Sequence, residues 1–259
     1  KVISKGYKVA ICEQVEDPKA AKGIVKREVI RIVTPGTNLN AQALDETKNN
    51  YLMCIVYIGD TYGISTADVS TGDYYVTEVD SSKKLLDEIT KFAPAEIIHN
   101  DYFLMSGASL DDIKNRLNIS VSALDRWYTD EDMCISKLKE HFKVSVIDGL
   151  GLKDYPIGTI AAGALLQYLY ETQKNALPHL TRLTPYQSGK YMIIDSATRR
   201  NLELLETLRE KQKRGSLLWV LDKTKTAMGA RLLRTYIEQP YIDKKQIENR
   251  LDAVEELSE

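Results

Sequence analysis

The sequence predicts an α/β fold followed by an all-α region: a mixed sheet flanked by helices, then long helices, with the tail of an α+β domain in front. Two patterns carry this prediction. Strand-like alternation with short turns recurs from residue 51 to 79, and apolar residues spaced three and four apart dominate from residue 156 onward. Hydrophobic residues make up 43% of the 259 residues and charged residues 28%, which is typical of globular proteins. This length corresponds to one large or two modest domains.

The first 36 residues alternate in the manner of β-strands. We expect strands at 8–12 and 25–33, with a turn or short helix starting at Asp17-Pro18 and an end at Pro35-Gly36. A segment this short is too small to form a domain alone, so it is interpreted as the tail of one. The chain starts without Met and without the apolar stretch of a signal peptide, so we expect it to be a fragment of a longer protein.

The middle of the chain follows a polar stretch over 40–50, which we interpret as a linker. Three strand-like runs come next, and the gaps between them are short enough for hairpins, so an antiparallel meander is predicted. Helices and short strands then alternate. The predicted order is strands at 51–58, 62–69 and 73–79, a helix at 81–92, a strand at 96–99, a helix at 109–117, a strand at 118–122 and a helix at 130–141.

That order of elements is the order of a ribonuclease-H-like fold, which often carries two-metal nucleases. Two-metal chemistry needs carboxylates that converge on two cations. In the nuclease version the first strand supplies an Asp, whereas the strand at 51–58 contains no carboxylate. Asp68 and Asp73 are interpreted as edge or turn residues. The nuclease therefore stays a minor alternative, which absence of Mg²⁺-dependent strand cleavage by the purified chain would exclude.

The last part of the chain is predicted to be helical. A continuous apolar face starts after Pro156, and Pro178 is expected to stop that helix. Three long helices follow, at 197–210, at 217–236 and after the capping residue Asp243. We expect their apolar stripes to pack into a core.

Charge and residue usage exclude several kinds of site. Residues 50–150 hold nine basic and seventeen acidic side chains, a balance of −8, so this segment would repel a phosphate backbone. Three cysteines and three histidines are scattered without a CxxC pair, which indicates a reduced cytoplasmic protein with no metal site. Gly149-Leu150-Gly151 lacks the third glycine of a dinucleotide-binding motif, and no ATP-cradling loop occurs, so no cofactor is expected. No apolar run approaches the ~18 residues of a membrane span.

Three stretches closely resemble one family, the bacterial MutS mismatch-repair proteins, in the family's order. The first is Gly6-Tyr7-Lys8-Val9-Ala10-Ile11-Cys12-Glu13-Gln14, continuing through Asp17-Pro18 to Arg27-Glu28-Val29-Ile30-Arg31-Ile32-Val33-Thr34-Pro35-Gly36-Thr37. The second is Ala161-Ala162-Gly163-Ala164-Leu165-Leu166-Gln167-Tyr168 with Leu177-Pro178-His179. The third is Ala197-Thr198-Arg199-Arg200-Asn201-Leu202-Glu203-Leu204, then Ser216-Leu217-Leu218-Trp219-Val220-Leu221-Asp222 and Thr226-Ala227-Met228-Gly229.

The resemblance implies a domain map and a function. Residues 1–40 resemble the end of the mismatch-recognition domain, 50–176 the catalytically silent connector domain, and 177–259 the start of the helical core or lever domain. The parent is implied to bind mispaired or unpaired bases in duplex DNA as a homodimer, and to become, with ATP and Mg²⁺, a sliding clamp that recruits MutL. The Phe-x-Glu wedge that reads a mismatch would lie before residue 1, and the ATPase domain after residue 259. The fragment itself is therefore expected to be a non-enzymatic coupling portion. Besides the nuclease, a second alternative is an interaction scaffold with no DNA role, which tight heteroduplex binding by the full-length protein would exclude.

Three groups of residues are candidates for function, each with a structural alternative. By family likeness, Ser136, Lys137, Lys139 and Glu140 form part of the MutL contact, unless they are simply a solvated helix face. Lys26, Arg27 and Arg31 line the DNA side of the recognition domain, or else an exposed β face. Arg199, Arg200 and Asn201 couple domains at the entry of the core, or else Arg200 and Asn201 satisfy backbone groups near a helix start.

Overall fold

The computed structural model divides the chain into two compact units. It describes residues 2–3, 6–16, 25–38, 45, 47–109, 111, 113–114, 117, 119–187, 189 and 191–258, without the side chain of Ser196. The sheet unit comprises Lys1–Leu44, Asn49–Ser82 and Phe92–Tyr186. The helical unit comprises Asp45–Lys48, Lys83–Lys91 and Gln187–Glu259. Within the described residues, no helix is both long enough and apolar enough to cross a membrane.

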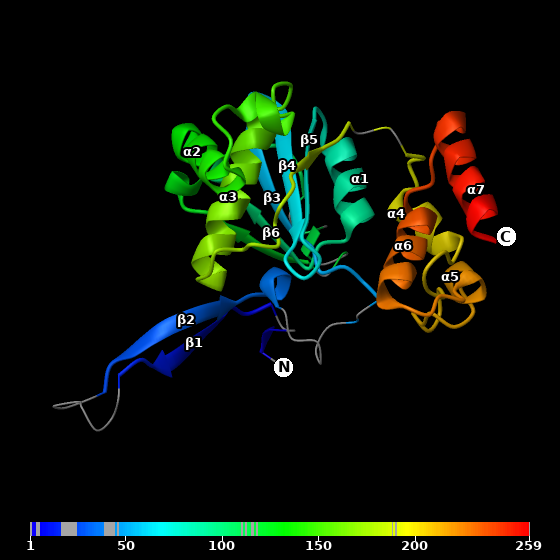
Figure 1. Ribbon diagram of the computed structural model, residues 1–259, viewed down its shortest axis with the longest axis horizontal. Coiled ribbons are helices and arrows are strands. Elements are labelled where there is room, and N and C mark those ends of the chain that lie inside the picture. Colours follow the sequence, from blue (N-terminus) through cyan, green and yellow to red (C-terminus); the bar gives the residue numbers. More distant parts are fainter. Residues whose placement is uncertain are drawn as a thin grey trace. The chain divides into compact units, whose positions relative to one another are not determined.

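A six-stranded mixed sheet forms the centre of the sheet unit, in the order β7-β6-β3-β4-β5-β8 (Figure 1). The predicted antiparallel meander is confirmed as β3, β4 and β5. On one side β6 and then β7 continue the sheet in parallel with β3, and on the other side β8 runs parallel to β5. The strands are β3 (Leu52–Ile58), β4 (Thr61–Asp68), β5 (Asp73–Val79), β6 (Glu96–His99), β7 (Ser120–Ala123) and β8 (Thr184–Pro185).

Local sequence explains the meander. The first five residues of β3 are fully buried, as expected for an apolar strand covered on both faces. Gly59 and Asp60 both have positive φ between the paired residues Ile58 and Thr61, which is the geometry of a two-residue type I′ hairpin. Asp68 ends β4 and accepts a hydrogen bond from the Ser70 amide at 2.8 Å, so it is a turn residue as predicted.

In the sheet unit one helix packs on the sheet and a second helix packs on the first. α3 (Pro156–Gln173) packs on β3, β4 and β5, and α2 (Glu131–Phe142) packs on α3 (Figure 1). Glycine makes both approaches close: a Cβ at Gly63 would lie 2.4 Å from the backbone of Ile157, and one at Gly163 only 2.3 Å from Cys134 Cβ. α3 starts at the predicted proline, but it ends at Gln173, before the capping residue Lys174 with its positive φ, rather than at Pro178.

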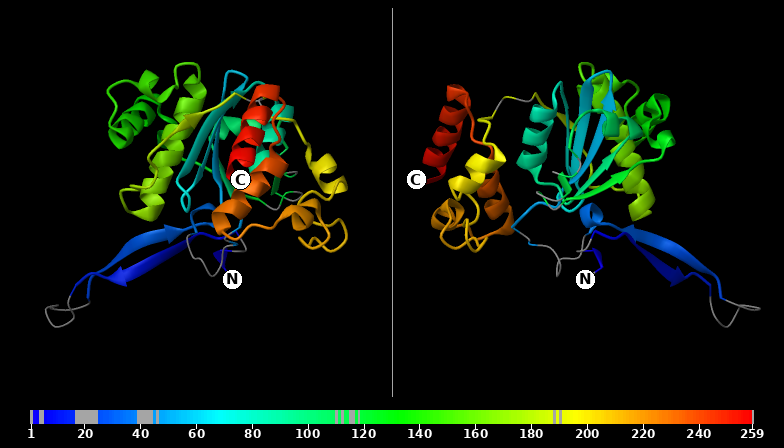
Figure 2. Two further views of the ribbon diagram at one scale, coloured as in Figure 1. Left: turned by 45° about the vertical axis from the view of Figure 1, so that its right-hand side comes forward. Right: turned by 180° about the vertical axis from the view of Figure 1, so that it is seen from behind.

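An antiparallel hairpin of β1 (Val9–Gln14) and β2 (Arg27–Val33) precedes the sheet and extends away from it (Figures 1 and 2). These are the two strands predicted for the first segment. The short 3₁₀ helix η2 (Pro35–Thr37) follows β2. The turn predicted at Asp17-Pro18, most of the polar stretch 40–50 and much of the helix predicted at 109–117 lie outside the described residues. Further 3₁₀ helices are η3 (Asp101–Met105), η5 (Arg126–Thr129) and η6 (Ile147–Leu150).

Two of the three helices predicted after residue 195 are shorter than predicted, whereas the third agrees with α7. The helix α1 (Ser82–Phe92) crosses the boundary between the two units. The helix predicted at 197–210 is wrong: the chain leaves the helical conformation after residue 201 because Glu203 adopts positive φ and its carboxylate accepts the Leu208 amide at 2.7 Å. The single helix predicted at 217–236 is two helices in the structure. The Asp222 carboxylate accepts the Thr224 amide in a turn, and Thr226 then caps the start of the second helix. The observed helices are α4 (Ser196–Asn201), α5 (Leu217–Leu221), α6 (Ala227–Glu238) and α7 (Lys244–Ser258).

The apolar stripes of this region do not pack as predicted. α7 starts after Asp243, whose side chain accepts the Gln246 amide at 2.8 Å, in agreement with the predicted cap. Its stripe is nevertheless exposed: Leu251 retains 61% and Leu257 87% of its surface. An apolar stripe is buried only where a second surface covers it, and periodicity alone does not supply that surface.

Candidate functional site

The four residues predicted to contact a partner lie on α2. Ser136 and Glu140 are exposed, whereas Lys137 is mostly covered. The Lys137 ammonium pairs with the Glu140 carboxylate at 3.0 Å and lies 4.2 Å from the centre of the Tyr170 ring. Lys139 is half-buried. The open part of this helix face is therefore formed by Ser136 and Glu140 rather than by the lysines.

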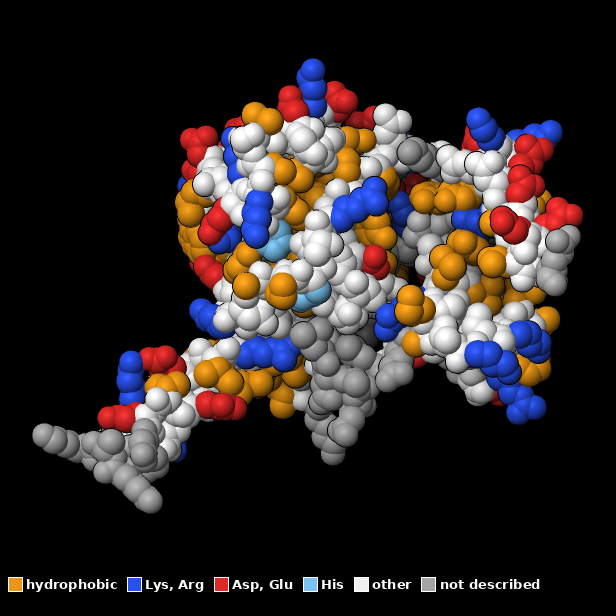
Figure 3. Space-filling view, in the orientation of Figure 1, with side chains coloured by type: hydrophobic (Ala, Val, Ile, Leu, Met, Phe, Trp, Pro, Cys, Tyr) orange, Lys and Arg blue, Asp and Glu red, His pale blue; other side chains and the backbone are white. Residues whose placement is uncertain are grey.

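The three basic residues predicted for the DNA side lie on and before β2. Lys26 and Arg27 are exposed, and Lys26 pairs with Glu28 at 2.5 Å, which raises the pKa of the Lys26 ammonium. Arg31 differs, because its Nη2 donates to the carbonyl of Thr37 at 3.1 Å and its buried Nε has no hydrogen-bond partner among the described residues. Hydrophobic side chains share the hairpin surface with the basic ones (Figure 3).

Of the three residues predicted at the entry of the core, only Arg199 is in an ion pair among the described residues. Its Nη1 lies 3.5 Å from Glu238 Oε1, and Arg234 Nε lies 3.2 Å from the same oxygen. Burial raises the pKa of Glu238 and lowers that of Arg199. The Arg200 and Asn201 residues are exposed. Arg199 therefore joins α4 to α6 within the helical unit.

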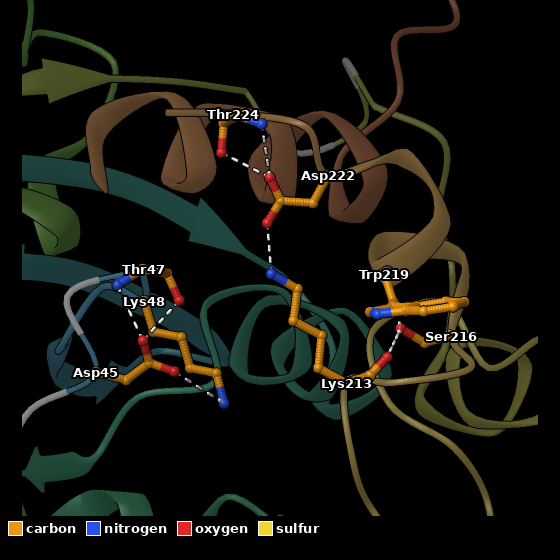
Figure 4. Close-up of polar contacts among 8 residues, drawn as sticks. All are labelled: Asp45, Thr47, Lys48, Lys213, Ser216, Trp219, Asp222 and Thr224. Carbon is orange, nitrogen blue, oxygen red and sulfur yellow. Dashed lines mark hydrogen bonds and ion pairs between the residues drawn. The ribbon is translucent and has the colours of Figure 1, made fainter. Parts of the chain in front are cut away.

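A second polar cluster of the helical unit surrounds the segment between α5 and α6 (Figure 4). The Asp222 carboxylate accepts hydrogen bonds from the Thr224 amide at 3.1 Å and its hydroxyl at 2.6 Å, and it also binds the Lys213 ammonium. Hydrogen bonding from Lys213 and then from Thr224 lowers the pKa of Asp222 to about 2. Ser216 caps α5 through the Trp219 amide at 3.2 Å.

A buried carboxylate that sequence reasoning missed lies at the base of the hairpin. Glu96, the first residue of β6, is fully buried. Its Oε2 accepts hydrogen bonds from the Thr34 hydroxyl and from the Gly36 amide at 3.1 Å, and its Oε1 accepts one from the Tyr168 hydroxyl at 2.8 Å. We call Thr34, Gly36, Glu96 and Tyr168 the Glu96 cluster. It joins three separate segments: the end of the hairpin, the sheet and α3.

Burial and charge keep the Tyr168 hydroxyl of the cluster protonated. Burial, and then the neighbouring Glu96 carboxylate, raise the pKa of Tyr168, so its hydroxyl remains a donor. The Lys8 ammonium, just before β1, lies 5.1 Å from the centre of the Tyr168 ring, which is within cation–π range.

Further hydrogen bonds hold the turn beside the cluster. The Thr37 carbonyl accepts from Gln173 Nε2 at 3.2 Å, in addition to the Arg31 guanidinium, and the Pro35 carbonyl accepts from Asn50 Nδ2 at 3.0 Å. At Gly36 a Cβ would lie 2.9 Å from the side chain of Leu52, so only glycine fits without displacement.

One signal in the sequence could have located this cluster. Glu96 is the only charged residue of the short strand Glu96–His99, which is completely buried, and a buried carboxylate needs donors. Its partners lie 62 and 72 residues away in the chain, so no local pattern identifies them. The cluster has the chemistry of a structural joint. Among the described residues, no three His, Cys, Asp or Glu side chains converge in a way that could hold a metal ion.

Comparison with protein-family models accounts for most of the chain in three consecutive matches. Residues 1–42 match the model for MutS domain I, residues 50–181 the model for MutS domain II, and residues 197–259 the model for MutS domain III. The second match alone covers about half of the chain.

Curated relatives match over the whole chain. A DNA mismatch repair protein MutS from Lachnoclostridium phytofermentans is 65% identical over 259 residues, which is 100% of this chain and 28% of the relative. Proteins of the same name from Ruminiclostridium cellulolyticum and Acetivibrio thermocellus are 50% and 49% identical over 99% and 100% of the chain, which spans 29% and 30% of their lengths. The chain thus spans about three tenths of the relatives it matches. It belongs to the MutS family.

Proposed function

We propose that this chain is the coupling portion of a protein that acts in DNA mismatch repair. The observation that carries the proposal is the 65% identity, over every residue of the chain, to a relative named for that process. The proposed domain map assigns residues 1–40 to the end of the mismatch-recognition domain, 50–176 to the connector, and 177–259 to the start of the helical core. In this map, later parts of the core cover the exposed stripe of α7.

The connector in this proposal has a ribonuclease-H-like fold without catalytic function. Support comes from the sheet, in which an antiparallel meander is continued by two parallel strands beside its first strand. Asp68 and Asp73, two carboxylates of this meander, accept hydrogen bonds from neighbouring turn residues. These bonds, together with those that Asp68 and Asp73 accept from Asn50 and Asn49, support structural roles for both carboxylates.

The parent protein, in this proposal, is a cytoplasmic homodimer that binds mispaired or unpaired bases, and ATP and Mg²⁺ bound in another domain convert it into a sliding clamp. Wedging an apolar side chain beside a mispair costs least where stacking is already weakened, which allows recognition without a base code. The acidic balance of residues 50–150 supports a connector that does not itself hold DNA.

Binding of the full-length parent to fluorescent duplexes tests this function. We expect tighter binding to a duplex with one mismatch than to the same duplex fully paired, and ATP should release the protein from a linear duplex with free ends. Equal affinity for the two duplexes, with or without ATP, would contradict the proposal.

The proposed MutL contact on α2 has its own test. The double variant K137E/K139E should weaken the capture of MutL by the ATP-bound parent, while the charge reversal K153E, at an exposed residue outside α2, should leave it unchanged. Because Lys137 also packs on Tyr170, the thermal stability of each variant must match that of the wild type. Unchanged MutL affinity in a stable K137E/K139E variant would remove the contact from this helix.

A further inference from the structure

We propose that the Glu96 cluster fastens the hairpin to the connector sheet, and that Glu96 is the positioning residue through which a displacement of the recognition segment reaches the connector. The identity of the two segments rests on the proposed function. The mechanical statement does not, because the hydrogen bonds themselves join the segment directly after β2 to β6 and α3.

The chemistry of the joint requires a carboxylate. Three donors from two segments converge on one side chain: the Thr34 hydroxyl and the Gly36 amide on one oxygen, and the Tyr168 hydroxyl on the other. The two hydroxyls can turn to other acceptors, but the Gly36 amide can only donate. A carboxylate, with about four acceptor positions, satisfies all three donors, and hydrogen bonds to a charged acceptor are about twice as strong as neutral ones.

Burial makes the joint open in an all-or-none manner. Thr34 and Glu96 are fully buried, and Tyr168 is 5% exposed. Water therefore cannot replace one bond at a time, and separating the hairpin would leave the buried Glu96 carboxylate with only the Tyr168 hydroxyl of its three donors. A buried charge that loses hydrogen-bond partners is strongly unfavourable. Such a joint is either closed or fully separated, which suits the transmission of a rigid displacement.

Other contacts indicate that the Glu96 cluster and its neighbours fix the orientation of the hairpin as well as its attachment to the sheet. Gln173 at the end of α3 and Arg31 of β2 both bind the Thr37 carbonyl, and Gly36 lies directly against Leu52 of β3. The hairpin leaves this base as a two-stranded arm, so a small rotation at Glu96 becomes a large displacement at the exposed Cys12 on β1.

Distance measurement between two spin labels tests the proposal on the whole chain. One label is placed on Cys12 and the other on the variant D132C, at an exposed position of α2. Cys54 and Cys134 are buried and should stay unlabelled. The unmodified joint should give one narrow distance distribution.

Substitutions at the joint should broaden that distribution. E96Q leaves one oxygen for three donors, and the milder Y168F removes a single donor and keeps the core packed. The matched control is E171Q, which removes a carboxylate of α3 that accepts the Tyr128 hydroxyl and, among the described residues, makes no hydrogen bond to the hairpin. We expect clear broadening in E96Q, less in Y168F and none in E171Q. Hydrogen exchange of the peptide containing Gly36 should accelerate roughly tenfold in E96Q, because the Gly36 amide loses the extra strength of a hydrogen bond to a charged acceptor.

Three outcomes would overturn the proposal: distributions in E96Q and the wild type that superimpose, equal broadening in E96Q and E171Q, or unchanged exchange at the Gly36 peptide. In the full-length parent, E96Q should retain mismatch preference but lose at least tenfold in ATP-dependent MutL capture. Equal losses in duplex binding and MutL capture would indicate a merely structural role. If the wild-type parent itself did not distinguish mismatched from paired duplexes, the proposed function would be wrong. The distance measurements would still show whether the Glu96 cluster holds the hairpin on the sheet.

Discussion

Helices α2 and α3 cross so closely at Gly163 that a single substitution there tests the distance between their backbones. Gly163 of α3 lies against Cys134 of α2, and an added Cβ would meet Cys134 Cβ at 2.3 Å, its Cα at 2.5 Å and its carbonyl oxygen at 2.7 Å. Ordinary contact begins at 3.4 Å, so the variant G163A forces the helices about 1 Å apart. No side-chain rotation can relieve the overlap, because two of the three atoms belong to the backbone.

The expected destabilisation is the difference between two effects. Overpacking a core costs about 1–3 kcal/mol, and a clash with backbone belongs at the upper end of that range. Replacing glycine by alanine inside a helix returns about 1 kcal/mol. We therefore expect G163A to lower the free energy of unfolding of the sheet unit by about 2 kcal/mol. The comparison variant G158A on the same helix meets the Val76 side chain at 2.9 Å and the Thr77 carbonyl oxygen at 3.3 Å, a smaller overlap than at Gly163, and should be destabilised less.

Urea unfolding followed by tryptophan fluorescence measures this difference. The two tryptophans lie in different units, Trp127 in the sheet unit and Trp219 in the helical unit, so the background variant W219F makes Trp127 the reporter of the sheet unit. A second substitution, C134A, should not restore stability, since the Cβ and backbone of residue 134 remain. If G163A were as stable as the background, or if C134A rescued it, the close backbone approach would be refuted.

Three further predictions follow from single side chains. Native Cys12 should react with a maleimide while the two buried cysteines do not, because burial raises the pKa of Cys134 to about 12; mass spectrometry should show one adduct before denaturation and three after it. N100A should destabilise the sheet unit by about 1–3 kcal/mol, since the Asn100 amide donates to and accepts from the backbone at the end of β3, at 3.1 and 3.0 Å; urea unfolding monitors the loss. Hydrogen bonding from Lys213 lowers the pKa of Asp222 to about 2, so the ionised carboxylate stabilises the helical unit fully above the unfolded pKa near 4, and this stabilisation is lost as the pH falls toward 2. The fluorescence of Trp219 should therefore change between about pH 4 and pH 2, and it should not change in that range in the variant D222N.

The sheet was predictable because its signals are local. Alternation predicts the strands, and Gly59-Asp60 gives the turn that joins the first two. The exposed Ile11 and Val29 on the hairpin show the limit of that approach, since the same alternation does not say which face another segment covers. Strand position is a property of the segment, whereas burial depends on what packs against it.

The helix bounds predicted for the helical unit were wrong for a different reason. Asp222 and Thr226 are residue types that favour a turn and a helix start, and Thr226 accepts the Gly229 amide at 3.0 Å, but the apolar period continues across them and favours one long helix. The end of α4 near Glu203 cannot be predicted from residue type, because Glu203 adopts a positive φ that is uncommon outside glycine. The Glu96 cluster was not predictable as a site, since its members are assembled only by the tertiary fold.

The last strand of the sheet has a consequence for solubility. β8 is only two residues long, pairs with Tyr75 and Val76 of β5, and contains Pro185, which has no amide hydrogen to offer. A short edge strand interrupted by proline is a poor template for a strand from another molecule. Residues 184–185 therefore protect the meander against edge-to-edge aggregation, and a shortened chain that ended before them would leave the long edge of β5 open to intermolecular pairing.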